Sequence, residues 1–212
     1  MKKFAFSMTI LLACAACLVS CGSRETKLFN GKDLDGWSFI LAPDSTTPAS
    51  EVFGVKDGVI TISGQPFGFM YTDAVYGDYE LHVEWRWPGE PTNSGIFINT
   101  RPEQVLWPYC AEVNLQAGRA GDMISSGGSA FEELKEAGGR FKPSPVPDKV
   151  ENPAGEWNYA DITNNGGYIR AFINGVLKNE AHMIDCTEGH IAIQSEGGPL
   201  EIRNIYITPL KK

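Results

Sequence analysis

Short segments in which apolar and polar residues alternate follow one another along almost the whole chain. Successive side chains of a β-strand point to opposite faces, so a strand with one buried face shows this alternation. The pattern predicts strands at residues 58–63, 68–72, 78–87, 94–100, 109–116, 157–165, 167–175, 176–180, 189–195 and 200–209. The stretches "NNGGY" and "INGVL" contain the Gly-Gly and Asn-Gly pairs that are typical of tight hairpins.

Helical periodicity is scarce. Only "SAFEELKEAG" (129–138) predicts a short helix, with Ser129 as its N-cap and Gly138 or Gly139 at its end. This segment falls within the long stretch 118–156, which is rich in Gly, Pro and Ser and is expected to be a functional or disordered loop. One short helix in a long loop, among about ten strands, predicts an all-β sandwich or jelly roll.

The N-terminus indicates export from the cytoplasm. Two lysines precede an apolar run, Phe4–Ala16, that is too short for a comfortable membrane span. The run ends in "LVSC", which resembles a bacterial lipobox; an ordinary cleaved signal is the alternative. We expect 1–20 to be a lipoprotein signal peptide, 21–26 a short tether with lipidated Cys21, and 27–212 a single domain. This predicts an anchor in the bacterial cell envelope, with the periplasmic side favoured over the cell surface.

The charge balance argues against a nucleic-acid partner. The chain has 18 basic and 26 acidic residues, and removing the leader with its two lysines leaves a net charge of −10. Such a surface repels phosphate backbones. Of the five cysteines, Cys110 and Cys186 remain in the expected domain, either as a disulfide or as two buried free thiols.

The strand "YCAEVNLQ" (109–116) carries polar residues on one face. Ala111, Val113 and Leu115 share the other face, whereas Glu112, Asn114 and Gln116 lie together. This polar face is either a solvated surface or the floor of a site. Amides serve sugar hydroxyls as donors and acceptors, and aromatic rings cover the apolar faces of sugars, so the composition favours a carbohydrate site.

Two further strands support this interpretation. Gln194 and Glu196 share a face in "GHIAIQSEGG", and Asn99 and Arg101 share a face with Phe97 in "NSGIFINTRP". The candidate aromatic platforms are Trp37, Trp107 and Tyr109.

The predicted site holds few acids. Jelly-roll glycanases often carry a Glu-x-Asp-x-(x)-Glu strand, but this chain has amides where the further carboxylates would be. One carboxylate suits a substrate that has been activated elsewhere, for which one base and some oxyanion donors suffice. The histidines His82, His182 and His190 show no metal-ligand spacing, so we predict neither metal nor cofactor, although carboxylates and amides can bind a hard cation without a motif.

Motifs spread over nearly the whole expected domain resemble the 3-keto-disaccharide hydrolase domain family, also called DUF1080. They are "KLFNGKDLDGW", "DYELHVEWRW…NSGIFI", "YCAEVNLQ", "GEWNYADIT", "AFINGVL" and "GHIAIQSEGGPLEIRNIYITPL". The resemblance implies a concanavalin A-like jelly roll that acts on glycosides whose C3 hydroxyl has been oxidised to a ketone. The ketone acidifies the C2 proton, so one carboxylate can remove it and the C1 substituent then leaves, with water addition completing a net hydrolysis.

The resemblance also implies residue roles. Glu112 matches the family's acid and is the expected base, with Arg101 and Glu196 as further catalytic residues. Arg101 is expected to replace a family arginine at the position of Asn99, and Glu196 stands where the family often has histidine. This last difference would supply a second carboxylate or mark a different reaction step. The expected substrate contacts are Asn93, Ser94, Asn99, Asn114, Gln194 and Trp107.

Four functions compete at this level. The leading hypothesis is an anchored hydrolase or lyase of oxidised (3-keto) saccharides, followed by a non-catalytic carbohydrate-binding module. A structural envelope protein would have Glu112 on an outer surface without a pocket. An ordinary glycanase would need a second acid, such as Glu84 or Glu196, within several ångströms of Glu112.

Overall fold

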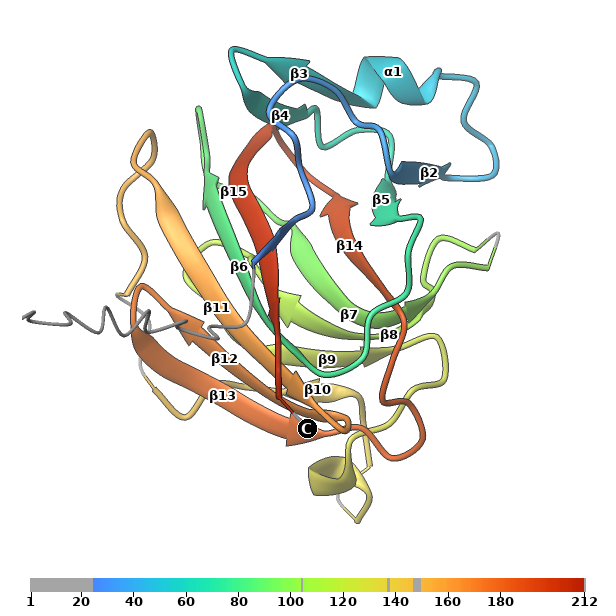
Figure 1. Ribbon diagram of the computed structural model, residues 1–212, viewed down its shortest axis with the longest axis vertical. Helices are drawn as coiled ribbons and strands as arrows, with labels where there is room; N and C mark the ends of the chain where they lie inside the picture. Colours follow the sequence, from blue (N-terminus) through green and yellow to red (C-terminus); the bar gives the residue numbers. More distant parts are fainter. Residues whose placement is uncertain (1–24, 104, 137, 147–149, 212) are drawn as a thin grey trace, which may run out of the picture.

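A computed structural model describes residues 25–103, 105–136, 138–146 and 150–211. Two antiparallel sheets pack face to face (Figure 1). One has the strand order β13-β12-β11-β6-β15-β4-β3, with β1 also paired to β15, and the other has the order β10-β9-β8-β7-β14-β5-β2. The predicted all-β jelly-roll sandwich is confirmed.

The strand bounds define the two layers. The eight-stranded sheet contains β1 (Thr26–Lys27), β3 (Phe53–Lys56), β4 (Val59–Ile62), β6 (Tyr79–Arg86), β11 (Asn158–Asn165), β12 (Tyr168–Ile173), β13 (Val176–His182) and β15 (Leu200–Pro209). The seven-stranded sheet contains β2 (Trp37–Leu41), β5 (Gly68–Thr72), β7 (Gly95–Arg101), β8 (Tyr109–Asn114), β9 (Met123–Ser126), β10 (Phe141–Lys142) and β14 (His190–Ser195). Two short helical turns, α1 (Ala49–Val52) and η1 (Glu132–Leu134), lie outside the sheets.

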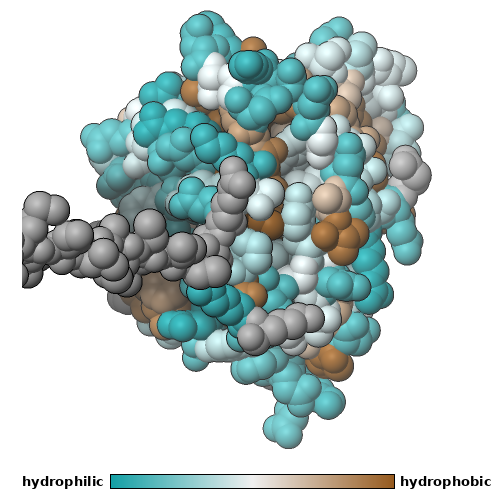
Figure 2. Space-filling model, in the orientation of Figure 1, coloured by the Kyte–Doolittle hydropathy of each residue, from teal (hydrophilic) through white to brown (hydrophobic). Residues whose placement is uncertain are grey.

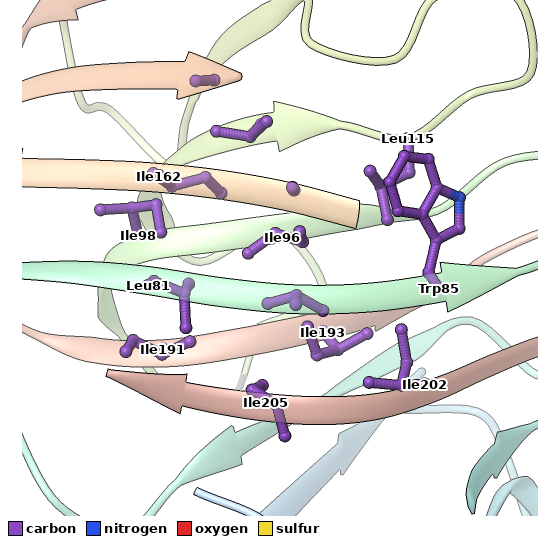
Figure 3. Close-up of a cluster of buried hydrophobic side chains, with 14 of the residues drawn as sticks. Leu81, Trp85, Ile96, Ile98, Leu115, Ile162, Ile191, Ile193, Ile202 and Ile205 are labelled. Atoms are coloured by element: carbon purple, nitrogen blue, oxygen red, sulfur yellow. The ribbon is translucent and has the colours of Figure 1, made fainter. Parts of the chain in front are cut away.

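The core fills the space between the sheets. Leu81, Trp85 and Ile162 from the eight-stranded sheet lie in one cluster with Ile96 and Ile193 from the other sheet (Figure 3). Each of these side chains is at most 1% exposed. Fully burying an aliphatic side chain contributes about 1.5–3 kcal/mol, so the cluster holds the sheets together. On the outer surface, polar residues cover most of the face shown in Figure 2, and apolar residues form small separate patches.

Every predicted strand is present, and β5 and β15 have the predicted bounds. The predicted helix 129–138 is instead a single 3₁₀ turn, η1. Ser129 does not cap it, because its hydroxyl donates to the carbonyl of Cys110 at 2.6 Å. The turn ends at Leu134 with Lys135 as its C-cap, and Gly138 lies beyond it with a φ of 67° and its N–H bonded to the carbonyl of Leu134 at 3.0 Å. The stretch predicted as a long loop also contains β9 and β10.

The two cysteines of the domain are buried and unpaired. Cys186 belongs to the core between the sheets, whereas Cys110 belongs to a second apolar cluster on the outer face of the seven-stranded sheet. The thiols therefore lie on opposite sides of that sheet, which excludes the disulfide alternative.

The predicted leader and Cys21 lie outside the described residues. Within the described part of the chain, no helix has the length and apolar character needed to cross a membrane.

Candidate active site

The candidate site lies on the outer face of the seven-stranded sheet. Glu112 of β8 is paired with Phe97 of β7, which is in turn paired with Ala192 of β14. Phe97 and Ala192 belong to the small apolar cluster Ile40, Phe69, Phe97, Cys110 and Ala192. Glu112 thus lies at the border between a buried apolar surface and a polar pocket.

The pocket has a volume of about 130 Å³. Its lining residues come from β8, β9, β10, the loops around them, the segment before β7 and the segment after β14: Asn93, Trp107, Glu112, Asn114, Gln116, Ile124, Arg140, Phe141 and Glu196. The structure therefore brings together five of the predicted site residues from separate parts of the sequence: Asn93, Trp107, Glu112, Asn114 and Glu196.

Glu112 is only 6% exposed. Burial, and to a lesser extent the nearby charge of Glu196, raises its pKa to about 8, while the cation Arg140 acts in the opposite direction. The strand opposite leaves room for the carboxyl because it has a glycine there. A Cβ atom built on Gly95 would lie 2.6 Å from Oε1 of Glu112.

Glu196 is the second acid of the pocket. It follows β14, and its backbone forms an isolated bridge with Asn93. Burial raises its pKa, and hydrogen bonds from the side-chain amides of Asn93 and Gln194 oppose that rise. In both amides the buried carbonyl oxygen, Oδ1 or Oε1, has no hydrogen-bond partner among the described residues, and of the two residues Asn93 lines the pocket, where its oxygen can accept a hydrogen bond from a ligand hydroxyl.

Arg140 is a residue that sequence reasoning missed. It immediately precedes β10, and its carbonyl oxygen accepts a hydrogen bond from the Ser125 N–H at 2.8 Å. Its exposed side chain lines the pocket with Glu112. No motif surrounds Arg140 in the sequence, and only the pairing of β10 with β9, and of β9 with β8, places it here.

Arg101 lies elsewhere, which corrects its predicted role. Its exposed guanidinium stacks on the ring of Tyr109 at 4.3 Å and donates to the carbonyl of Asp185 at 3.4 Å. It lines a separate cavity with His190.

Asn99 does not contact the pocket either. The β7–β8 register shifts between Ile98 and Arg101, and Asn99 has a φ of 54°. This irregularity breaks the alternation of the strand, and Asn99 is 0% exposed. Its amide donates to Oδ1 of Asn164 at 3.2 Å and its Oδ1 accepts from Asn164 at 3.0 Å, so it links the two sheets.

The remaining predicted residues have structural roles. The hydroxyl of buried Ser94 donates to the carbonyl of Gln194 at 2.8 Å, and the Gln194 amide bonds to Glu196. Trp37 is 5% exposed and donates its indole N–H to the carbonyl of Leu28, so it is a core residue and no sugar platform. Trp107, by contrast, is 45% exposed at the pocket.

Glu84, considered as the second acid of a glycanase, lies on β6 in the eight-stranded sheet. It pairs there with Arg203 at 2.6 Å and Asn204 at 2.6 Å. In the described ranges, no three His, Cys, Asp or Glu side chains are grouped so that they could hold a metal ion.

Solved structures with a similar fold include a provisionally named glycosyl hydrolase from Parabacteroides distasonis ATCC 8503. It is 22% identical, with a TM-score of 0.65, and the match covers 88% of this chain and 94% of that one. The carbohydrate-binding module CBM66 from Bacillus subtilis is 10% identical, with a TM-score of 0.55 and coverage of 80% and 93%. A β-glucanase from Bacillus licheniformis is 14% identical, with a TM-score of 0.58 and coverage of 91% and 100%.

At these identities the likeness shows the fold alone. A comparison with curated proteins found no significant relative. The model of the 3-keto-alpha-glucoside-1,2-lyase-like domain, however, matches residues 24–208. This match confirms the family that the sequence motifs resemble, and the chain belongs to the 3-keto-alpha-glucoside-1,2-lyase-like domain family.

Proposed function

We propose that this pocket cleaves the glycosidic bond of 3-keto-glycosides and that Glu112 begins the reaction by removing the C2 proton. The observation that carries the proposal is a carboxyl that is 6% exposed, opens into a small polar pocket and has a pKa raised to about 8. A carboxylate with a raised pKa is a stronger base once it is ionised. A ketone next to C2 makes that proton acidic enough for such a base.

The bonds change in two stages. Glu112 takes the C2 proton, and the electron pair of the C–H bond forms a C2=C3 double bond, which leaves the negative charge on the former ketone oxygen. The enolate then re-forms the ketone, moves the pair into C1=C2 and breaks the C1–O bond. Glu112, which now carries the C2 proton, supplies it to the departing oxygen, and the negative charge of Glu196 helps to keep the pKa of Glu112 high. Addition of water, with OH to C1 and H to C2, completes a net hydrolysis.

The other residues of the pocket suit a sugar. The exposed ring of Trp107 offers a surface for the apolar face of the ring. The unpartnered carbonyl oxygen of Asn93 can accept a hydrogen bond from a sugar hydroxyl. Glu112 therefore carries out the proton transfer, whereas Asn93 and Trp107 position the sugar.

A carbohydrate-binding module is the second candidate. The unpartnered amide oxygen of Asn93 favours it, because this oxygen needs only a ligand hydroxyl and no reaction. The likeness to CBM66 agrees with the fold that such a module would have. An ordinary glycanase is less compatible, because its nucleophile has to be ionised at neutral pH and the pKa of Glu112 is about 8.

The test compares release of the aglycone from a 3-keto-α-glucoside and from its unoxidised parent. The proteins are the mature wild type, Glu112→Gln and the matched control Glu84→Gln, whose site lies in the other sheet. We expect release from the keto substrate alone, a loss of about 10²–10⁴-fold in Glu112→Gln and no loss in the control. Saccharide binding without release from either substrate would instead identify a binding module. Release from the unoxidised parent would identify a glycanase.

A further inference from the structure

Arg140 and Glu112 both line the pocket, but they form no ion pair with each other. In the ion pairs of the described residues the N–O distance is at most 4.0 Å, and no distance this short joins Arg140 to Glu112. The cation nevertheless lies close enough to oppose the rise in the pKa of Glu112. The pocket is therefore lined by a buried carboxyl and a guanidinium that are not in ion-pair contact.

The surroundings of Arg140 keep its backbone in place while its side chain stays accessible. Its carbonyl oxygen accepts a hydrogen bond from the N–H of Ser125 at 2.8 Å, and Ser125 belongs to β9. The next residue, Phe141, pairs with Ile124, and both also line the pocket. The other basic side chains of this region are directed elsewhere: Arg119 pairs with Asp122 at 3.0 Å, and Lys142 donates to Asn179 at 2.7 Å.

We propose that Arg140 is a catalytic residue that binds the C3 oxygen of the substrate and stabilises the enolate. This inference rests on the proposed function and adds to it the group that receives the negative charge. Proton removal from C2 needs a base on one side of the C2–C3 bond and a donor at the oxygen on the other. The space between Glu112 and Arg140 meets this requirement, because an arginine offers two parallel N–H donors to a charged oxygen.

The assignment also predicts that the pocket distinguishes a ketone from a hydroxyl. A guanidinium can only donate hydrogen bonds, so it interacts more strongly with an enolate oxygen than with a neutral hydroxyl. The stabilisation that Arg140 provides therefore increases as negative charge develops on the C3 oxygen in the transition state. We expect the loss of Arg140 to lower kcat far more than it raises KM.

The experiment uses the mature protein, a 3-keto-α-glucoside with a chromogenic aglycone and the same substrate deuterated at C2. Arg140→Ala is expected to lower kcat by about 10²–10³-fold, with KM changed less than fivefold. Millimolar guanidinium chloride is expected to restore part of the kcat, since the pocket is open to solvent at Arg140. The matched control is Arg170→Ala, which replaces an arginine on β12 in the opposite sheet and is expected to keep wild-type kcat.

Two further measurements separate catalysis from folding. Arg140→Lys, which keeps the charge without the fork of donors, is expected to retain more activity than Arg140→Ala. The pH at which kcat/KM levels off is expected to move upward in Arg140→Ala, because Glu112 loses the cation that faces it and keeps Glu196 beside it and Cys110 on its own strand. A primary deuterium isotope effect in this variant would show that proton removal limits the rate.

The outcomes distinguish the two proposals. A wild-type protein that cleaves the keto substrate, together with an Arg140→Ala variant of equal kcat, overturns the role of Arg140 and leaves the proposed function intact. An Arg140→Ala variant that is slow, insensitive to guanidinium and unchanged in its pH profile also overturns the role. A wild-type protein that does not cleave the keto substrate overturns both.

Discussion

Glu112 combines burial with access to a pocket, and this combination determines its chemistry. Water that would stabilise its charge is largely excluded, and the acid Glu196 lies close by. Both effects favour the protonated form. Because the ionised form of Glu112 is unfavourable, transfer of an acidic substrate proton to Glu112 is favourable, since it converts the carboxylate into a neutral acid.

The pH dependence of the reaction follows from this pKa. A base has to be ionised, and with a pKa of about 8 only about one tenth of Glu112 is ionised at pH 7. We predict that kcat/KM for a 3-keto-α-glucoside rises about tenfold per pH unit below the pKa and levels off above pH 8. Initial rates between pH 5 and 9.5 measure this directly. A profile that falls from pH 5 upward would show that Glu112 acts as an acid in the rate-limiting step.

The sequence placed Glu112 correctly in the pocket, but the arginine that it selected, Arg101, lines another cavity. Alternation along β8 is regular, so the face of Glu112 can be read directly from its neighbours. Arg140 reaches the same pocket through two successive strand pairings across a turn-rich stretch. Such pairings depend on contacts between distant residues, which a single sequence does not encode in any local pattern.

At the scale of the elements, β7 contributes a glycine as well as its apolar residues. Gly95 pairs with Asn114, and the Glu112 carboxyl lies over it. The missing side chain leaves the volume in which this carboxyl is held. The position of the predicted base therefore depends on a residue that has no chemistry of its own.

We predict that Gly95→Ala lowers kcat/KM by at least tenfold while the protein remains folded. The new Cβ would lie 2.6 Å from Oε1 and 2.9 Å from Cγ of Glu112, so the side chain has to move. A displacement of about 1 Å can cost on the order of 10²-fold in rate. The matched control is Gly89→Ala, where no atom lies within 4 Å of the added carbon. Equal activity of the two variants would show that the carboxyl tolerates displacement.

The bulge in β7 explains why the sequence misplaced Asn99. Strict alternation predicts that Asn99 shares a face with Phe97, but an extra residue in the strand turns it into the interior. Asparagine tolerates a positive φ better than most residues, yet it does not mark a bulge as clearly as glycine would. The predicted strand was correct, and the error was confined to the residues after the bulge.

We predict that Asn99→Ala lowers the free energy of unfolding by about 2–4 kcal/mol. The substitution removes one hydrogen-bond partner of the buried Asn164 amide, which costs about 1–3 kcal/mol. It also places alanine at a φ of 54°, a left-handed backbone conformation that asparagine tolerates better than alanine does. Asn99→Gly relieves the backbone strain alone and is expected to be about 1 kcal/mol less destabilised. Urea denaturation of both variants measures the difference. Two variants of wild-type stability would contradict the role of Asn99 between the sheets.

For the molecule as a whole, the sandwich architecture was predictable because apolar and polar residues alternate along most of each long strand, even where a register shift interrupts the pattern, as in β7. The shorter elements were not, since β1 and β10 have two residues each and α1 has four. Elements this short have no measurable period, and tertiary pairing determines them. The sequence left open whether Cys110 and Cys186 form a disulfide, and their positions on opposite sides of the seven-stranded sheet show that they do not.

We predict that the mature domain contains free Cys110 and Cys186. The seven-stranded sheet separates the two thiols, so a disulfide would require the sheet to open. Titration of the denatured protein with a thiol reagent, without prior reduction, is expected to modify both cysteines. The melting temperature is expected to be unchanged by a reducing agent. If neither cysteine reacted, the two thiols would be joined in a disulfide, which would contradict their separation by the sheet.

The entry of the chain into the fold has a consequence for where a membrane would lie. Glu25 borders a cavity with His82 and Asp161 on the outer side of the eight-stranded sheet, and β1 then joins β15. We propose, from the lipobox, that a lipid is attached at Cys21. Three residues, 22 to 24, then separate Cys21 from Glu25, and the four steps between these two Cα atoms span at most about 14 Å of extended chain. Such a short connection would hold the eight-stranded sheet next to the lipid. The Glu112 pocket, on the outer face of the other sheet, would then open towards the aqueous phase, from which a dissolved sugar could enter it.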